Sequence, residues 1–313
     1  MANKRLQNKV AESRLALPIV AIYAILVWIA TGLLTYQLWG QFICMVVTAV
    51  TVMELNNRYA LIRIYSRMVS CAFLVLISMA NFLFPSLSVG IVCVCLAFFY
   101  LIIFHTYQNK NATGVVFHAF LCIGIASLFF IQILYFLPLL WFIMGTLLVS
   151  LHKKTFFASI IGILTPYWLW SGYTVYTGQT QDMITHFKQL TEFQDFFDFT
   201  IISGRQIASL VFIVLLLLIG TIHFLRKSSY DKIRTRDLYY TIMIMAFTIL
   251  AFILFQPQQY EMLLGLLIIC TAPLIAHFIA LTHTKITNIT FYIILITTLT
   301  ITIFNLWNPS LTF

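Results

Sequence analysis

The stretch GVVFHAFLCIGIASLFFIQILYFLPLLWFIMGTLLVSL, residues 114–151, contains no Lys, Arg, Asp or Glu. As a single helix its 38 residues would be about 57 Å long, well beyond the ~30 Å of membrane hydrocarbon. Gln132 and Pro138 mark a place where the chain can turn back. We therefore expect two apolar helices here, residues 114–133 and 134–151, in a membrane-embedded protein.

The composition of the whole chain is that of a protein whose surface lipid must cover. Of its 313 residues 62% are apolar and 9% are charged, and the mean hydropathy is +0.99. A soluble domain is nearer half apolar and a quarter charged. The net charge of +9 would suit nucleic acid, but the basic residues sit at membrane edges and not on one folded face. We therefore expect an integral membrane protein that does not bind nucleic acid.

Apolar runs of spanning length recur along the chain, and a span needs about 20 such residues. They predict an all-α, polytopic transmembrane helical bundle of about 11 spans, forming a single integral membrane domain over residues 1–313. The six cysteines fall inside these runs and are expected to be reduced thiols, and no cofactor or metal motif is present. The predicted spans are residues 17–38, 41–55, 68–84, 87–107, 114–133, 134–151, 155–175, 205–225, 238–255, 262–281 and 288–307.

The basic residues orient this bundle. Sixteen of the 18 Lys and Arg residues fall in every second connection, and only Lys188 and Arg205 fall on the other side. Cytoplasmic loops of membrane proteins carry the excess of Lys and Arg. The pattern predicts a cytoplasmic N-terminus, an external C-terminus and an external connection at about residues 176–203. Dividing residues 114–151 into two spans keeps Lys153 and Lys154 on the cytoplasmic side.

The external connection carries an amphipathic pattern. Between residues 182 and 198, Met183, Phe187 and Leu190 fall on one helical stripe, with charged residues roughly opposite. This predicts an amphipathic external helix between spans 7 and 8. The helix would either lie on the outer membrane surface or close as a lid over an external cavity.

A candidate site follows from the residues around this connection. Aromatic side chains in the outer half of the seventh span suit either a membrane-interface belt or a platform for sugar rings. An external arginine suits either snorkelling to the headgroups or a bidentate grip on phosphate. The candidate external anion or glycan site comprises Arg205, Tyr167, Trp170, Tyr173, Asp182, His186, Glu192 and Asp195.

Two polar features lie toward the predicted cytoplasmic side. His105, His118, His223 and His277 lie toward the cytoplasmic ends of spans, where a proton relay is one role for them, but no pair has metal-ligand or triad spacing. The connection 56–67 places its apolar residues on one side and its arginines at the edge. It predicts an in-plane cytoplasmic helix against anionic lipid, or a docking surface for a cytoplasmic partner.

Four short runs carry a resemblance to a known group of proteins. They are residues 55–67 (LNNRYALIRIYSR), 124–129 (GIASLF), 137–141 (LPLLW) and 162–167 (GILTPY). In them the chain resembles an uncharacterised family of polytopic bacterial inner-membrane proteins, over roughly residues 40–180. The resemblance implies a bacterial inner membrane but brings no established activity. The layout is also similar to surface-polysaccharide polymerases. Residues 37–41 (QLWGQ) lack the acid that integral-membrane glycosyltransferases place in the first external loop.

These observations leave three functions open. The external acids and arginine favour handling of lipid-linked glycan or other envelope intermediates at the external face. The alternatives are a transporter or flippase for a small or lipidic substrate, and a non-catalytic membrane scaffold. Membrane lipids are the expected partners, with polyprenyl-linked sugar intermediates under the first function. The sequence does not decide whether the chain is an enzyme.

Overall fold

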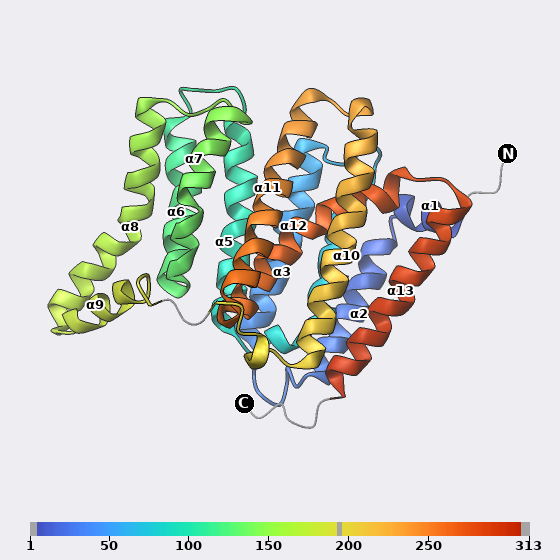
Figure 1. The fold of residues 1–313 in the computed structure, drawn as a ribbon, viewed down its shortest axis with the longest axis horizontal. Helices are drawn as coiled ribbons and strands as arrows, with labels where there is room; N and C mark the ends of the chain where they lie inside the picture. The colour runs from blue at the N-terminus through green and yellow to red at the C-terminus, as the bar shows by residue number, and fades with distance from the viewer. Residues whose placement is uncertain (1–4, 193–195, 308–313) are drawn as a thin grey trace.

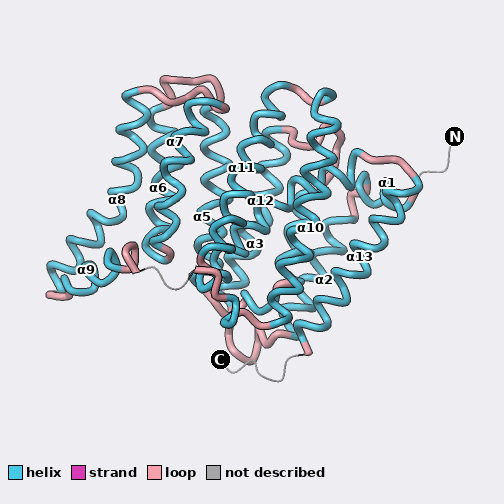
Figure 2. Tube along the Cα trace, viewed as in Figure 1, coloured by secondary structure: helices cyan, strands magenta, loops and turns pink. Residues whose placement is uncertain are grey.

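The computed structural model describes residues 5–192 and 196–307, and this part of the chain is helical with no β-strand (Figures 1 and 2). Short 3-10 turns interrupt or join the α-helices. The prediction of an all-α protein is confirmed. The helices are α1 (Leu6–Glu12), α2 (Ala16–Ala30), α3 (Trp39–Tyr59), α4 (Met68–Met79), α5 (Leu87–Ile103), α6 (Thr113–Phe129), α7 (Leu137–Thr146), α8 (Lys153–Thr177), α9 (Thr180–Lys188), α10 (Gly204–Lys227), α11 (Ile233–Phe255), α12 (Tyr260–Leu281) and α13 (Lys285–Leu306).

From α2 onward the long helices run alternately up and down the bundle, because short connections join them (Figure 1). Helix α12 forms the centre and packs against α4, α5, α10 and α11. In its most apolar stretch 94% of the residues are buried inside the protein, against 22% for α13. Protein therefore surrounds α12, whereas α13 presents most of its surface outward.

The count of about 11 spans is not supported. Each of the 11 predicted segments contains a helix, but among the described residues only α3, α5, α10, α11, α12 and α13 are long and apolar enough to cross a membrane. Helices α1 and α2, bent by 92° at their junction, add a seventh if they form one span. The 12 residues of α4 extend only about 18 Å, against ~30 Å of hydrocarbon. Helix α8 has 25 residues, but its second half is rich in Trp, Tyr, Ser and Thr.

The division of residues 114–151 into two helices is confirmed. Helix α6 ends at Phe129, and Phe130 leaves the helical region with φ −146° and ψ 85°. A 3-10 turn, Ile131–Phe136, then leads into α7, whose second residue is Pro138. Proline suits this position because its missing N–H has no helical partner there.

Helix α8 packs closely on α6 through two glycines. A Cβ on Gly162 would lie 2.5 Å from the carbonyl oxygen of Phe117, and one on Gly124 would lie 2.7 Å from that of Ile163. Small residues permit this approach of two backbones, as is common between membrane helices. Helix α6 therefore provides most of the contact between the bundle and α8, and α9 follows α8.

The predicted in-plane helix over residues 56–67 is wrong. Helix α3 continues to Tyr59, and Ala60 ends it in the left-handed conformation with φ 46°. The following residues turn inward, and Leu61 and Ile62 are buried in the core. The apolar side chains that suggested a membrane-facing stripe instead anchor a loop.

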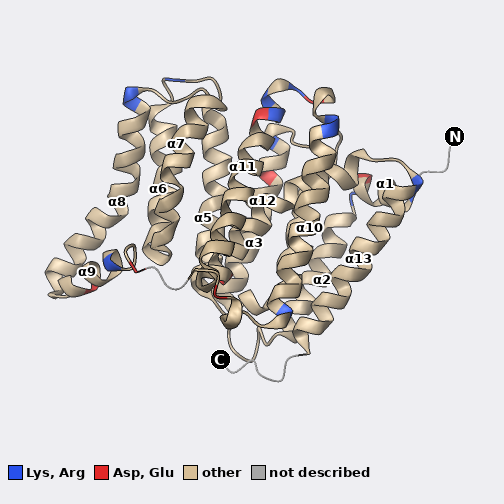
Figure 3. Ribbon diagram, viewed as in Figure 1, with Lys and Arg blue, Asp and Glu red and all other residues tan. Residues whose placement is uncertain are grey.

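Charged residues gather at one end of the bundle, where α8 and α11 begin and α10 ends (Figure 3). Few lie at the opposite end, where α9 and the start of α10 are found (Figure 3). We refer to these as the basic end and the opposite end. The predicted amphipathic helix between the seventh and eighth segments is present as α9, but it begins two residues earlier than expected and ends at Lys188. Leu190, expected on its apolar stripe, lies in the turn that follows the helix.

Candidate functional site

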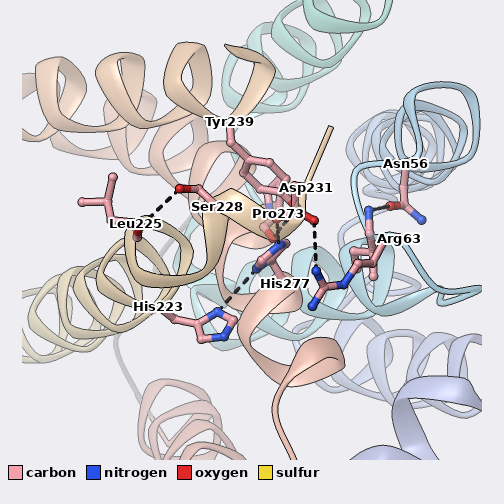
Figure 4. Close-up of polar contacts among 10 residues, drawn as sticks. Asn56, Arg63, His223, Leu225, Ser228, Asp231, Tyr239, Pro273 and His277 are labelled. Carbon is pink, nitrogen blue, oxygen red and sulfur yellow. Dashed lines mark hydrogen bonds and ion pairs between the residues drawn. The ribbon is translucent and has the colours of Figure 1, made fainter. Parts of the chain in front are cut away.

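A row of ionisable side chains in mutual contact lies at the basic end, between α10, α12 and the connection that precedes α11 (Figure 4). His277 Nε2 lies 3.2 Å from Asp231 Oδ2, and His277 Nδ1 lies 3.4 Å from His223 Nδ1. The side chain of His277 is fully buried, and that of Asp231 is 2% exposed. We call His223, His277, Asp231 and Arg63 the relay cluster.

The packing of α10 on α12 brings the two histidines together. A Cβ on Gly220 would lie 2.7 Å from the carbonyl carbon of Leu274, so these helices touch through backbone at this point. His223 and His277 each follow their contact residue by three positions, about one helical turn. The ring centroids are consequently 5.3 Å apart.

Asp231 enters the cluster from the connection between α10 and α11. A 3-10 turn, Ser228–Tyr230, follows α10, and the Asp231 N–H donates to Ser228 O at its end. Asp231 then takes an extended backbone that precedes α11. Its Oδ1 atom has no hydrogen-bond partner among the described residues, although a guanidinium nitrogen of Arg63 lies 3.8 Å away.

Arg63 reaches Asp231 from the loop between α3 and α4, and Asn56 fixes this loop. The Asn56 side chain donates to Ser66 O at 2.9 Å and accepts from the Ile62 N–H at 3.2 Å. The Arg63 guanidinium also lies 5.6 Å from the centre of the Tyr230 ring, a cation–π contact. Its side chain is 41% exposed, so Arg63 joins the buried carboxylate to the surface of the basic end.

Aromatic rings enclose the imidazole of His277. The rings of Tyr239 and Phe224 lie 5.2 and 5.3 Å from it, both nearly edge-on. Tyr239 is itself buried, and its hydroxyl donates to Pro273 O at 3.4 Å (Figure 4). These walls keep His277 in a low-dielectric environment, where a change of its charge has a large energetic effect.

The relay cluster is suited to holding and passing a proton. Its two imidazoles share one N···N contact, so one nitrogen must donate and the other accept. The far nitrogen of His223, Nε2, is buried without a hydrogen-bond partner in the described part of the chain. The groups form a line rather than converging on one point. Among the described residues no group of three or more His, Cys, Asp or Glu could hold a metal ion.

The structure brings together only part of the site predicted from the sequence. Tyr167 donates to Ser127 Oγ at 2.8 Å, and His186 Nε2 lies 3.1 Å from Ser127 O. The ring centroids of Trp170 and His186 are 5.2 Å apart, and Phe187 lies 5.1 Å from Tyr167. Burial lowers the pKa of His186 below its ordinary value, and the bond to Ser127 partly opposes this. We call Tyr167, Trp170, His186 and Phe187 the aromatic group.

The other predicted residues do not join the aromatic group. Tyr173, Asp182 and Glu192 are exposed, and Asp195 lies outside the described residues. Arg205 is half-buried at the start of α10, which packs on α12 and α13, whereas α8 and α9 stand on the far side of α5–α7 (Figure 1). A cavity shared by Arg205 and the aromatic residues is therefore not formed.

Sequence reasoning noticed the two histidines of the relay cluster but missed Asp231 and Arg63. His223 and His277 are 54 residues apart, and their pairing depends on how two helices pack. One signal was present, because Asp231 is an acid among the basic residues that surround it in residues 226–236.

Comparisons of the chain with protein-family models, with curated proteins and with solved structures found no match. The resemblance to a bacterial inner-membrane family, and the looser one to polysaccharide polymerases, therefore stay predictions. The function has to be inferred from the geometry of the relay cluster.

Proposed function

We propose that the protein is a proton-coupled membrane transporter and that the His277–Asp231 pair is its proton-binding site. The observation that carries this proposal is the line of contacts from His223 through His277 to Asp231 and Arg63. It belongs to the transporter class of function, one of the three that the sequence left open.

Burying these ionisable groups costs free energy of folding, so their presence suggests a functional role. Ionisable residues inside membrane helices are rare and commonly mark ion pathways or proton relays. Here Arg63 balances the charge of Asp231, so protonation of the histidine pair adds one net positive charge to an enclosed site. Lys227, 5.5 Å from the Tyr230 ring, is a second cation close by. Binding and release of a proton would therefore change the contacts of the loop that carries Arg63.

A second polar cluster near the opposite end gives the proposed route another terminus. The Asn305 side chain donates to Met79 O and Ser209 Oγ, and that of Asn81 donates to Thr302 O. The Oδ1 atoms of both asparagines are buried without a partner among the described residues, which suits a site for water. An apolar cavity of about 130 Å³ lies among α2, α4, α12 and α13, with Leu216 of α10 in its wall. None of its lining residues belongs to either polar cluster, so the proposal requires a conformational change to join the two.

The proposal places the basic end in the cytoplasm of a bacterial inner membrane. The support is the concentration of Lys and Arg at that end (Figure 3) and the positive-inside rule. The alternating direction of the helices favours passage of the shorter ones through the bundle as well, which would restore the 11 crossings. Reporter fusions at Leu151 and Ser203 should report the cytoplasm and the outside, respectively. The same compartment for both would contradict this topology.

The experiment for the proposed function uses the proton alone as the probe. Proteoliposomes of the full chain on a solid-supported membrane are exposed to a pH jump from about 7.5 to about 6, a range in which histidine changes its charge. We expect a transient charge displacement that His277→Gln removes and His118→Gln keeps. His118 is the control because it is exposed and contacts only its own helix, at Gly114 O. No displacement in the unmodified chain, or an equal one in both variants, would contradict the proposal.

A second candidate is the handling of lipid-linked glycans at the outer face. The aromatic group favours it, because the partly exposed Trp170 lies beside His186 at the opposite end, and an indole ring is a suitable platform for a sugar. The separation of Arg205 from this group counts against a joint phosphate and sugar site. Binding of a polyprenyl-linked disaccharide that Trp170→Ala abolishes and Trp168→Ala leaves unchanged would support it. Trp168 is the control because it lies on the same helix and is 76% exposed.

A further inference from the structure

An apolar groove runs along the bundle between α2 and α3. Both helices pack against α4, which forms the floor, and they make little direct contact with each other. The groove has a volume of about 270 Å³. Apart from Arg67 its lining is apolar, and Val46 of α3 lies at the exposed rim.

The groove has the length of one membrane leaflet. Away from the basic end Trp28 closes it, because its indole N–H donates to Met45 Sδ at 2.8 Å and its ring contacts Phe42. On α3 the lining extends from Phe42 to Met53, about 17 Å at 1.5 Å per residue. Half of the ~30 Å hydrocarbon layer is a similar length. A lipid chain entering from the basic end would therefore fit within its own leaflet.

Arg67 stands at the basic end of this groove with its charge unmatched. Three arginines occupy the α3–α4 region: Arg58 pairs with Glu54 at 3.7 Å, and Arg63 pairs with Asp231. In the part of the chain that the structure describes, Arg67 forms no ion pair. The Arg67 guanidinium contacts the Tyr65 hydroxyl at 3.1 Å and Met53 Sδ at 3.3 Å.

The neighbouring loop holds Arg67 in place. Ser66 O accepts from the Asn56 side chain, and Ser66 Oγ accepts from the N–H of Met68, the first residue of α4. The arginine is therefore presented from a fixed backbone. A guanidinium held in this way can bind two oxygens of one phosphate.

We propose that the groove is a binding site for an anionic phospholipid, with one acyl chain between α2 and α3 and the phosphate on Arg67. The apolar lining accounts for the chain, and the unmatched arginine at the membrane edge accounts for the charge. The site does not depend on proton-coupled transport, because neither His277 nor Asp231 takes part in it.

The test measures retention of phosphatidylglycerol and of phosphatidylcholine with the same acyl chains, by native mass spectrometry of the full-length chain. We expect the unmodified protein to retain phosphatidylglycerol in preference. Arg67→Gln should lower its affinity at least about tenfold, the loss of one charged hydrogen-bonding partner. Arg58→Gln, at the same end but already paired, should change it little. Excess inorganic phosphate should not displace the lipid, because it lacks a chain.

The apolar part of the site has its own pair of variants. Val46→Trp places a large side chain in the groove and should reduce retention of both lipids, whereas Ile43→Trp on the same helix should not. Ile43 is 58% exposed and does not line the groove. Equal retention of the two lipids by the unmodified chain would overturn the proposal. So would equal effects of Arg67→Gln and Arg58→Gln, or of the two tryptophan variants.

Discussion

Replacing Gly220 by alanine should separate α10 from α12 and misalign the relay cluster. An added Cβ would lie 2.7 Å from the carbonyl carbon of Leu274 and 2.9 Å from its Cβ and its oxygen. That is about 0.7 Å short of normal contact, and the atoms belong to backbone or to a rigid Cβ that cannot rotate away. Overpacking of this kind costs about 1–3 kcal/mol, and the better helix propensity of alanine returns up to about 1 kcal/mol.

The net loss for Gly220→Ala is therefore between about 0 and 3 kcal/mol, centred near 1.5 kcal/mol. At about 2–4 °C per kcal/mol the apparent Tm should fall by several degrees. Thermal unfolding in detergent, followed by intrinsic fluorescence, measures this change. Gly204→Ala is the matched control, because it lies on the same helix and its added Cβ would meet no atom within 4 Å. The two variants should also differ in the pH-jump charge displacement, since only Gly220→Ala moves His223. Equal Tm values for both would refute the close approach of α10 and α12.

Three further predictions test other parts of the structure. Asn56→Ala should destabilise the protein by about 1–3 kcal/mol and expose the loop that carries Arg63 and Arg67 to protease. Asn57→Ala, at an exposed position, should do neither. Equal cleavage of the two variants would count against the anchoring role of Asn56. Gly162→Ala should loosen α8 from α6 and lower the Tm, whereas Gly172→Ala, with open space around it, should not. A lower Tm for Gly172→Ala than for Gly162→Ala would show that the α6–α8 contact is misplaced. Because burial lowers the pKa of His186, docking of α9 should be complete above the ordinary histidine pKa and should weaken as the pH falls below it. Hydrogen exchange of residues 180–191 at the two pH values, corrected for intrinsic rates, measures this, and a pH response that persists in His186→Asn would assign it to another group.

The helices could be predicted because their signals are local. Apolar runs, the break before Pro138 and the stripe containing Met183 and Phe187 placed the segments and α9. The number of spans could not be predicted, because packing against the surrounding helices determines where α4 and α7 end. The connection 56–67 misled for a related reason. Its apolar residues have helical spacing, but Ala60 adopts a left-handed backbone so that Leu61 and Ile62 can enter the core.

The site was harder to predict, because contacts between distant segments create it. The aromatic residues of α8 and His186 of α9 are close in sequence and do meet. Arg205 is also close in sequence, but the fold carries α10 to the other side of the bundle (Figure 1). The relay cluster depends on a glycine contact between α10 and α12 and on a loop fixed by Asn56. Neither contact has a pattern that a single sequence reveals.

The most direct measurement is nitrogen-15 NMR of histidine-labelled full-length protein in nanodiscs at one fixed pH, which reports the hydrogen bonding of each ring nitrogen. If His223, His277 and Asp231 form one proton-binding chain, Asp231→Asn should shift the ring-nitrogen signals of both imidazoles. Asp237→Asn should shift neither, because the Asp237 carboxylate accepts from the Tyr107 hydroxyl instead. A His223 signal unaffected by Asp231→Asn, or equal effects of the two variants, would contradict the proton-binding chain.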